Sequence, residues 1–277
     1  MEEEAKKSQE GEIDLSIIIP SYNEKKRFPR TLEAYMSFFD KLPIKYEIIF
    51  ADYSNDGSKD LIREYQKKHS NIVLLNINSK GKGIAVLEAF RICRGKFLSF
   101  TDADNATPPE EFYKMYNSFE GYDAVIGSRG LSRSHVKSWH KSPQRRIGSF
   151  VLGVFFVKII YGLDIKDTQC GAKIFRREKL IQVLPMMRIK DGIFDIELLW
   201  RFKRIGRINE VPISWTDDKF SNFKWRDTIY HAIWLLWVRF DLQKLYALEE
   251  LKTLDTIPIA VPEPARIQEF KTLKTRS

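Results

Sequence analysis

The sequence predicts an α/β fold with a mainly parallel sheet and helices on both of its faces. Strand-like and helix-like segments alternate through residues 15–104, and the strand-like segments are short, continuous apolar runs. Strands that are buried on both faces have this pattern, and parallel neighbours need a crossover that is usually a helix. With 277 residues and 43% hydrophobic content, the chain can form one large domain with appendages.

The predicted elements follow one another at regular intervals. They are a strand at 15–19 that Pro20 should end, a helix at 31–40, a strand at 46–51, a helix at 61–69, a strand at 72–77, a helix at 83–94 and a short strand from Gly95 toward Asp104. Because ligands of parallel sheets bind at the carboxyl ends of the strands, four polar clusters should meet at one edge. They lie at residues 20–24, 52–56, 78–83 and 102–104.

Two carboxylates, Asp102 and Asp104, lie where the fourth strand runs out. Unpaired carboxylates are costly to bury, so a cation is expected beside them. Two hard oxygen ligands with open coordination positions suit Mg²⁺ or Mn²⁺ holding a diphosphate. For an isolated Asp-x-Asp, a solvated turn with a helix cap would be preferred. The neighbouring clusters favour the metal interpretation here.

The neighbouring clusters leave two roles open for several residues. Gly81, Lys82 and Gly83 open a helix after the third strand and suit either a phosphate or a plain turn with a solvated lysine. Asp52 ends the second strand and could accept a hydrogen bond from a nucleobase or a ribose. Asp56 is better explained as a helix cap than as a ligand.

The chain is basic, with a net charge of +9, which favours an anionic partner. No acidic residue occurs from Ala124 to Leu163, and apolar residues with helical spacing follow the cations. The stretch is therefore interpreted as an interfacial helix beside a phosphate pocket, in preference to a solvated loop before a core helix. No nucleic-acid-binding motif accompanies the charge, so no nucleic-acid partner is expected.

The two cysteines have no metal-ligand spacing and form no disulfide framework, so a reducing cytosol is expected. No apolar stretch reaches the roughly 20 residues of a membrane span. We predict a flexible acidic N-terminus at 1–13, a main domain at 14–224, an amphipathic helical extension at 225–255 and a mobile tail at 256–277. The extension is rich in Trp and Tyr, which suit either core packing or a membrane interface.

The ordered motifs resemble the family-two inverting glycosyltransferases, and among them the polyprenyl-phosphate sugar synthases of the dolichyl-phosphate glucosyltransferase group. The motifs are Pro20-Ser-Tyr-Asn-Glu24, Glu47-Ile-Ile with Asp52, Asp56-Gly57, Lys80-Gly-Lys-Gly83, Asp102-Ala-Asp104, Gly127-Ser-Arg129, Asp167-Thr-Gln-Cys-Gly171 and Val211-Pro-Ile-Ser-Trp215. The resemblance covers about residues 13–224. It implies a GT-A-type fold that transfers glucose from UDP-glucose to dolichyl or polyprenyl phosphate, with Mg²⁺ or Mn²⁺, on the cytosolic face of a membrane.

The resemblance also implies roles for individual residues. Asp102 and Asp104 are similar to the metal pair, and with Arg129 and Arg145 they form the expected catalytic set. The expected donor-binding residues are Pro20, Tyr22, Glu24, Asp52, Lys82 and Asp102. The expected acceptor-phosphate residues are Arg129, Arg145, Ser149 and Gln169, and Lys219 could substitute for an acceptor-side Arg that is missing near Asp217 or Asp218. A phosphate acceptor needs no general base, because a phosphate monoester is already ionised at neutral pH.

The chain departs from the family pattern at four places, one of which is Phe220-Ser-Asn222, where Gly-Ser-Lys is usual after the Val-Pro-Ile strand. Ala51 replaces the first of two adjacent Asp residues, Ala106 occupies a position that is Gln in some mannosyl members, and an acceptor-side Arg near Asp217 is missing. The alternatives are transfer of mannose from GDP-mannose, transfer to a hydroxyl with Asp195 or Glu197 as the base, and a non-catalytic protein that binds nucleotide sugars.

Overall fold

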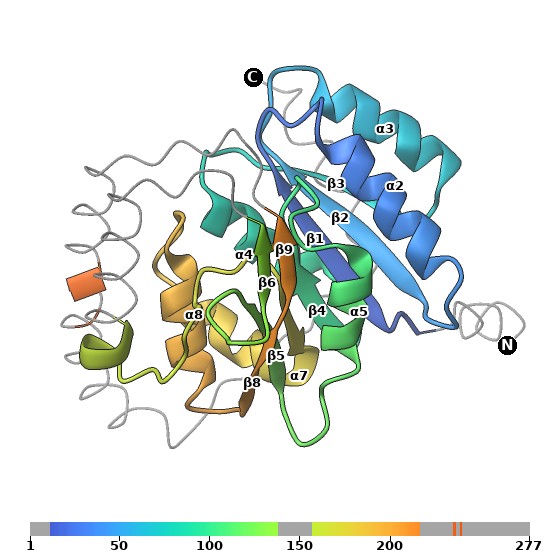
Figure 1. Ribbon diagram of the computed structural model, residues 1–277. Helices are drawn as coiled ribbons and strands as arrows, with labels where there is room; N and C mark the ends of the chain where they lie inside the picture. The colour runs from blue at the N-terminus through green and yellow to red at the C-terminus, as the bar shows by residue number, and fades with distance from the viewer. Residues whose placement is uncertain (1–11, 138–156, 217–234, 237–238, 240–277) are drawn as a thin grey trace, which may run out of the picture. The chain divides into compact units, whose positions relative to one another are not determined.

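The computed structural model describes residues 12–137, 157–216, 235–236 and 239. A central sheet runs through them in the strand order β3-β2-β1-β4-β7-β5-β8 (Figure 1). Its strands are β1 (Leu15–Ser21), β2 (Tyr46–Asp52), β3 (Ile72–Asn76), β4 (Phe97–Phe100), β5 (Ala124–Ser128), β7 (Lys173–Arg176) and β8 (Ile208–Pro212).

The sheet is mainly parallel, as predicted. β1 pairs in parallel with β2 and β4, β2 with β3, and β5 with β8. Only β7 runs antiparallel to its neighbours β4 and β5 among the described strands. Because β7 runs antiparallel to β4, its first residue, Lys173, pairs with Phe100, the last residue of β4. The segment before β7 therefore lies near the paired carboxylates that follow β4.

Helices cover both faces of the sheet, which confirms the predicted layering. The helices are α2 (Phe28–Phe39), α3 (Ser58–Lys68), α4 (Lys82–Ile92), α5 (Pro109–Tyr116), α7 (Arg177–Val183) and α8 (Phe194–Phe202), with a short 3₁₀ turn η2 (Leu184–Met186). α2, α3 and α5 share one buried apolar cluster with the side chains of Ile17 and Ile19. On the other face, Phe100 contacts Phe90 of α4 and Phe194 of α8. This alternation along the strands explains why the apolar runs are continuous.

Pro20 does not end β1, contrary to the prediction. The strand continues to Ser21, which pairs with Asp52 of β2. Thr101 donates its N–H to the Ile18 carbonyl, so alternate β1 residues face β4. Pro20 also faces that side, but β4 has already ended at Phe100. The missing N–H of Pro20 therefore removes no sheet hydrogen bond.

A second, two-stranded sheet pairs β6 (His135–Lys137) with β9 (Ser214–Thr216). Within the described residues, no helix has both the length and the apolar content that crossing a bilayer requires. The predicted amphipathic extension and the predicted tail lie outside the described residues, apart from residues 235–236 and 239. Their helical structure and membrane contact therefore stay predictions, as do the predicted domain boundaries.

Candidate active site

A cleft with an empty volume of about 800 Å³ opens at the carboxyl ends of β1, β2 and β4. All four polar clusters predicted to meet at this edge contribute to its wall. The lining residues are Pro20, Ser21, Tyr22, Glu24, Tyr53, Lys80, Gly81, Lys82, Ala85, Asp102, Ala103 and Asp104. The cleft thus combines three carboxylates, two lysines and two tyrosines, which is a composition suited to a metal-bound anionic ligand with a flat ring.

Asp102 forms an ion pair with the lysine that begins α4. Lys82 Nζ lies 2.6 Å from Asp102 Oδ1, and each side chain is 31% exposed. Burial acts to raise the pKa of Asp102, but the charge and hydrogen bond of Lys82, with contributions from Arg129 and Lys173, leave this pKa below its ordinary value. Asp102 is therefore an anion at neutral pH, with a cationic partner already beside it.

Asp104 lies in a turn that is anchored to α2. Its Oδ1 accepts a hydrogen bond from the Ala106 N–H at 3.0 Å, and Thr31 Oγ1 donates to the Ala103 carbonyl at 2.7 Å. The buried Tyr35 hydroxyl lies 3.0 Å from the Thr107 carbonyl on the far side of the turn. These contacts fix the backbone that carries both carboxylates.

The two carboxylates fit a divalent cation that completes its shell from a ligand. Among the described residues, no group of three or more His, Cys, Asp and Glu side chains converges on a metal position. Mg²⁺ is commonly held by one or two carboxylates together with substrate phosphates and water. Asp102 and Asp104, which both line the cleft, match that donor set.

Gly171 packs directly against the Asp102 carboxylate. A Cβ built on Gly171 would lie 1.9 Å from Asp102 Oδ2, so no larger residue fits while Asp102 keeps this position. The preceding carbonyl, that of Cys170, accepts a hydrogen bond from Lys173 Nζ at 2.5 Å. The segment at 167–171 therefore forms a wall against which Asp102 is held, a role that the sequence did not indicate.

A buried ion pair lies behind this wall. Lys173 of β7 is fully buried, and its Nζ lies 2.7 Å from Asp195 Oδ1 of α8 and 5.1 Å from the centroid of the Phe100 ring. Burial raises the pKa of Asp195, and the charge of Lys173 only partly opposes this. Sequence reasoning missed Lys173, because a single lysine in a short strand gives no signal of burial.

Glu197 is also buried, and both of its carboxylate oxygens accept hydrogen bonds. One of its oxygens accepts the Arg188 and Ile189 N–H groups, and the other lies 2.8 Å from Arg201 Nε. The contacts of Asp195 and Glu197 are thus ion pairs and backbone hydrogen bonds within the core, and both acids lie in the first turn of α8, where the helix dipole favours negative charge.

Arg129, at the end of β5, makes a bidentate ion pair with Asp167. Its Nε lies 2.7 Å from Oδ2 and its second terminal nitrogen 2.9 Å from Oδ1. The guanidinium carbon also lies 5.0 Å from the centroid of the Trp215 ring, and the Gln169 N–H donates to Asp167 Oδ1 at 3.2 Å. Arg129 and Gln169 thus belong to one fixed cluster. Arg145, Ser149 and Lys219 lie outside the described residues, and their predicted roles stay predictions.

Replacing Asp167 with Asn should destabilise the fold at neutral pH. Burial raises the pKa of Asp167, but Arg129 outweighs this and leaves it below the ordinary 3.8. The stabilisation is thus complete above that value and is lost as the pH falls through the lowered folded pKa. We expect Asp167→Asn to cost roughly 1.5–3 kcal/mol at pH 7, the contribution of hydrogen bonds to charged groups. Urea unfolding at pH 7 and pH 3 should show a smaller difference at pH 3; equal differences at both values would contradict the role of the carboxylate charge.

Asp52 ends β2 but does not line the cleft. It is fully buried, and its two oxygens accept the Ser54 N–H at 2.8 Å and the Ser54 hydroxyl at 2.7 Å. These contacts give Asp52 a structural role and leave its contact with a nucleobase a prediction. Asp56 accepts the N–H and the hydroxyl of Ser58, the first residue of α3, but the N-cap residue of this helix is Gly57, so Asp56 supports the start of the helix from the residue before the cap.

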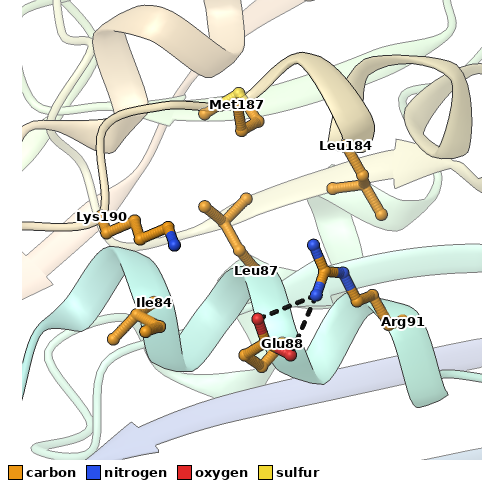
Figure 2. Close-up of a pocket in the computed structure, with 7 residues that line it drawn as sticks. All are labelled: Ile84, Leu87, Glu88, Arg91, Leu184, Met187 and Lys190. Carbon is orange, nitrogen blue, oxygen red and sulfur yellow. Dashed lines mark hydrogen bonds and ion pairs between the residues drawn. The ribbon is translucent and has the colours of Figure 1, made fainter. Parts of the chain in front are cut away.

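The start of α4 is packed against the segment before α8. The Lys190 carbonyl accepts the Ile84 N–H at 2.8 Å, so one of the N–H groups predicted to be available to a phosphate is already used. Figure 2 shows the small pocket on this side of α4, where Leu87 points toward Met187 and Leu184 beside the Glu88–Arg91 ion pair. Four apolar side chains line it together with the Glu88–Arg91 pair and Lys190, which indicates packing that holds α4, and Lys82 with it, against the site.

A comparison with known protein families identifies the family to which the chain belongs. The profile of glycosyl transferase family 2 matches residues 16–184, more than half of the chain. The chain belongs to this family. The family 2 match extends from the first residues of β1 to η2 and so includes the cleft, the paired carboxylates and Gly171.

Family 2 relatives resemble the chain over most of its length. A dolichyl-phosphate beta-glucosyltransferase of Dictyostelium discoideum is 35% identical over 229 residues, covering 74% of this chain and 67% of the relative. One from Trichomonas vaginalis is 32% identical over 243 residues, covering 81% and 72% respectively. One from Saccharomyces cerevisiae is 32% identical over 232 residues, covering 74% and 67%.

Solved structures confirm the predicted GT-A-type fold of this family 2 chain. Glucosyl-3-phosphoglycerate synthase from Mycobacterium tuberculosis, in complex with Mn²⁺, UDP and phosphoglyceric acid, superimposes with a TM-score of 0.60 at 17% identity. That match covers 86% of this chain and 82% of the other. Mannosyl-3-phosphoglycerate synthase from Rubrobacter xylanophilus gives a TM-score of 0.56 at 15% identity, covering 87% and 77%.

Proposed function

We propose that this chain is a metal-dependent inverting glucosyltransferase that moves glucose from UDP-glucose to dolichyl or another polyprenyl phosphate. The relatives at 32–35% identity carry the name dolichyl-phosphate beta-glucosyltransferase. The observation that carries the proposal is the cleft at the carboxyl ends of the strands, where Asp102, Asp104 and Lys82 meet. Such a site suits the diphosphate of a nucleotide sugar.

On the donor side, Lys82 and the paired carboxylates would hold the leaving diphosphate. Asp102 and Asp104 would bind Mg²⁺ or Mn²⁺, which supplies positive charge to the phosphate oxygens as the bond to the sugar breaks. Lys82 contributes a second positive charge from the start of α4. Its present partner, Asp102, keeps the ammonium directed at the cleft, 2.6 Å from the carboxylate.

On the acceptor side, the chain needs to position an anion and does not need to remove a proton. A lipid phosphate is a nucleophile that is already ionised at neutral pH. Arg129, Gln169, Arg145, Ser149 and Lys219 would orient it and offset its repulsion from the donor diphosphate. Arg129 is fixed for this task by Asp167.

The buried acids count against a hydroxyl acceptor. Asp195 is 2% exposed and paired with Lys173, and Glu197 is fully buried and paired with Arg201. A general base must come within hydrogen-bonding reach of the proton it removes. Neither acid lines the cleft, and a phosphate acceptor does not require a general base.

The membrane is proposed as the place of the reaction, because a polyprenyl phosphate resides in a bilayer. A net charge of +9 favours an anionic membrane surface. We propose peripheral attachment on the cytosolic face.

The test is glucose transfer by the purified full chain from radiolabelled UDP-glucose to dolichyl phosphate in detergent, with Mn²⁺ or Mg²⁺. Parallel reactions contain GDP-mannose as donor or dolichol as acceptor. We expect a β-linked glucosyl phospholipid and little product in the parallel reactions. Transfer to dolichol but not to dolichyl phosphate would show a hydroxyl acceptor and overturn the proposal.

Replacing Lys82 with Met should weaken donor binding selectively. Hydrogen bonds to charged groups contribute about 1.5–3 kcal/mol, which corresponds to roughly a 10- to 150-fold rise in the donor Kd. The KM for lipid phosphate should change much less. Lys114→Met is the control, because Lys114 makes a comparable 2.6 Å ion pair with Glu111 on α5 but does not line the cleft. An equal effect of Lys82→Met on donor and acceptor would contradict the donor assignment.

A further inference from the structure

We propose that Glu197 is a positioning residue for the donor site. It fixes the backbone of residues 188–191, and this segment in turn holds the start of α4 so that Lys82 points into the cleft. The inference rests on the proposed function, since it concerns how the chain places Lys82 for the donor diphosphate. It gives Glu197 a part in the reaction that is not the part of a general base.

Glu197 binds the beginning of the 188–191 segment from within the core. It is fully buried in the first turn of α8, and its Oε2 accepts the Arg188 N–H at 3.0 Å and the Ile189 N–H at 2.7 Å. Its Oε1 lies 2.8 Å from Nε of Arg201, which is itself 2% exposed. Because charge-assisted hydrogen bonds are short and directional, the carboxylate keeps both peptide groups in one place.

The end of the same segment is packed on the first turn of α4. The Lys190 carbonyl accepts the Ile84 N–H at 2.8 Å, and these two residues lie side by side in Figure 2. A Cβ built on Gly81 would lie 2.6 Å from the Lys190 carbonyl oxygen, and a Cβ on Gly83 would lie 2.6 Å from the Asp191 carbonyl oxygen. Real Cβ contacts are essentially never so short. The two glycines on either side of Lys82 therefore allow the segment to approach the helix.

The segment also supplies a cap that α4 lacks. The N-cap residue of this helix, Gly81, has no side chain that could accept a hydrogen bond. An N-cap side chain normally accepts the N–H of the second or third helical residue. The Lys190 carbonyl takes its place, because Ile84 is the third residue of α4. Lys82 is the first residue, so the cap fixes the turn that carries it, with Nζ 2.6 Å from Asp102 Oδ1.

The acceptor side of the site is held by other elements. Arg129 is paired with Asp167, whose N–H is bound by Glu210 of β8 at 2.9 Å. Loosening the 188–191 segment should therefore disturb Lys82 and leave the acceptor side in place. A role of Glu197 in stability alone would instead affect donor and acceptor alike.

The first test replaces Glu197 with Gln, which keeps the size of the side chain. One end of the Gln amide is a donor, so either the two backbone N–H groups or Arg201 lose their acceptor. Calorimetry with UDP and Mn²⁺ should show a Kd raised roughly 2- to 30-fold, the effect of losing a helix cap. The KM for lipid phosphate should stay within about twofold of the wild type.

Glu47→Gln is the matched control, because Glu47 is a buried acid that is bound in a similar way near the start of β2, at the end of the sheet opposite the cleft. It is 1% exposed and accepts the Arg94 N–H at 2.7 Å and the Arg94 Nε–H at 2.9 Å. Its replacement should lower stability but leave the UDP Kd within about twofold. An equal rise of the UDP Kd in both variants would show a general loss of stability and overturn the inference.

The second test asks whether the effect passes through Lys82. In a Lys82→Met background, Glu197→Gln should change the UDP Kd by less than about twofold, since the group that it positions is gone. An undiminished effect would overturn the inference, while glucose transfer by the wild type would leave the proposed function intact. Dependence on Lys82 without any glucose transfer would refute the proposed function alone.

Gly83→Ala tests the same contact and decides the matter if Glu197→Gln does not fold. The new Cβ would lie 2.6 Å from the Asp191 carbonyl oxygen and 2.8 Å from Phe194 Cβ, so the segment must move away from α4. The φ of Gly83 is not positive, and Ala favours a helix, so the substitution does not strain α4 itself. The UDP Kd should rise, but not in the Lys82→Met background. Gly192→Ala, whose Cβ meets no atom within 4 Å, should leave it unchanged. A wild-type UDP Kd in Gly83→Ala would overturn the inference.

Discussion

Asp102→Asn should lower the rate of glucose transfer by roughly 1,000-fold or more, because a metal ion contributes several kcal/mol of charge stabilisation and each 1.36 kcal/mol changes the rate tenfold. The substitution keeps the size of the side chain and an oxygen that can accept the Lys82 hydrogen bond, now 2.6 Å long. It removes the negative charge that would bind a divalent ion. Initial rates with UDP-glucose, dolichyl phosphate and Mn²⁺ measure the loss.

The same variant should also lose Mn²⁺-dependent binding of UDP while it remains folded, with a thermal midpoint within roughly 4 °C of the wild type. Asp123→Asn is the matched control. Asp123 directly precedes β5, at the end of the sheet opposite the cleft, and its Oδ2 likewise accepts a hydrogen bond, from the Arg207 N–H at 2.8 Å. If Asp102→Asn retained Mn²⁺-dependent UDP binding at wild-type affinity, Asp102 would not be a metal ligand.

The parts of the fold that depend on local pattern could be predicted from sequence. The predicted strands at 46–51 and 72–77 correspond to β2 (Tyr46–Asp52) and β3 (Ile72–Asn76), because buried parallel strands have continuous apolar sequences. Since the carboxyl ends of parallel strands share one edge of a sheet, the four polar clusters could be predicted to meet there even though the order of the strands was not known. The cleft lining follows this prediction closely.

The parts that depend on pairing between distant residues could not be predicted. Lys173 looks like a surface residue in sequence, and only the antiparallel insertion of β7 between β4 and β5 buries it against Asp195. Asp52 ends a strand as predicted, but its burial and its two hydrogen bonds from Ser54 could not be predicted from the strand pattern. Tyr53 was overlooked, although it follows β2 much as Tyr22 follows β1, and this parallel position was a usable signal.

Gly171→Ala should lower glucose transfer roughly 100-fold or more, since a displacement of about 1 Å at a catalytic group can cost that much. The new Cβ would lie 1.9 Å from Asp102 Oδ2, closer than any real contact. The peptide cannot easily retreat, because Lys173 holds the Cys170 carbonyl and is itself paired with Asp195. The Asp102 carboxylate must therefore turn away from its present position. Mn²⁺ affinity in the presence of UDP should fall, while the KM for lipid phosphate should change little.

Gly192→Ala is the control for this substitution, because a Cβ at Gly192 meets no atom within 4 Å and its φ is not positive. It should leave the rate unchanged and should not lower stability. If Gly171→Ala unfolds at the same urea concentration as the wild type but has lost Mn²⁺ affinity, the glycine acts through Asp102. Wild-type Mn²⁺ affinity and rate in Gly171→Ala would instead show that the carboxylate can function from another position, and the fixed Asp102 geometry would then not be required for the reaction.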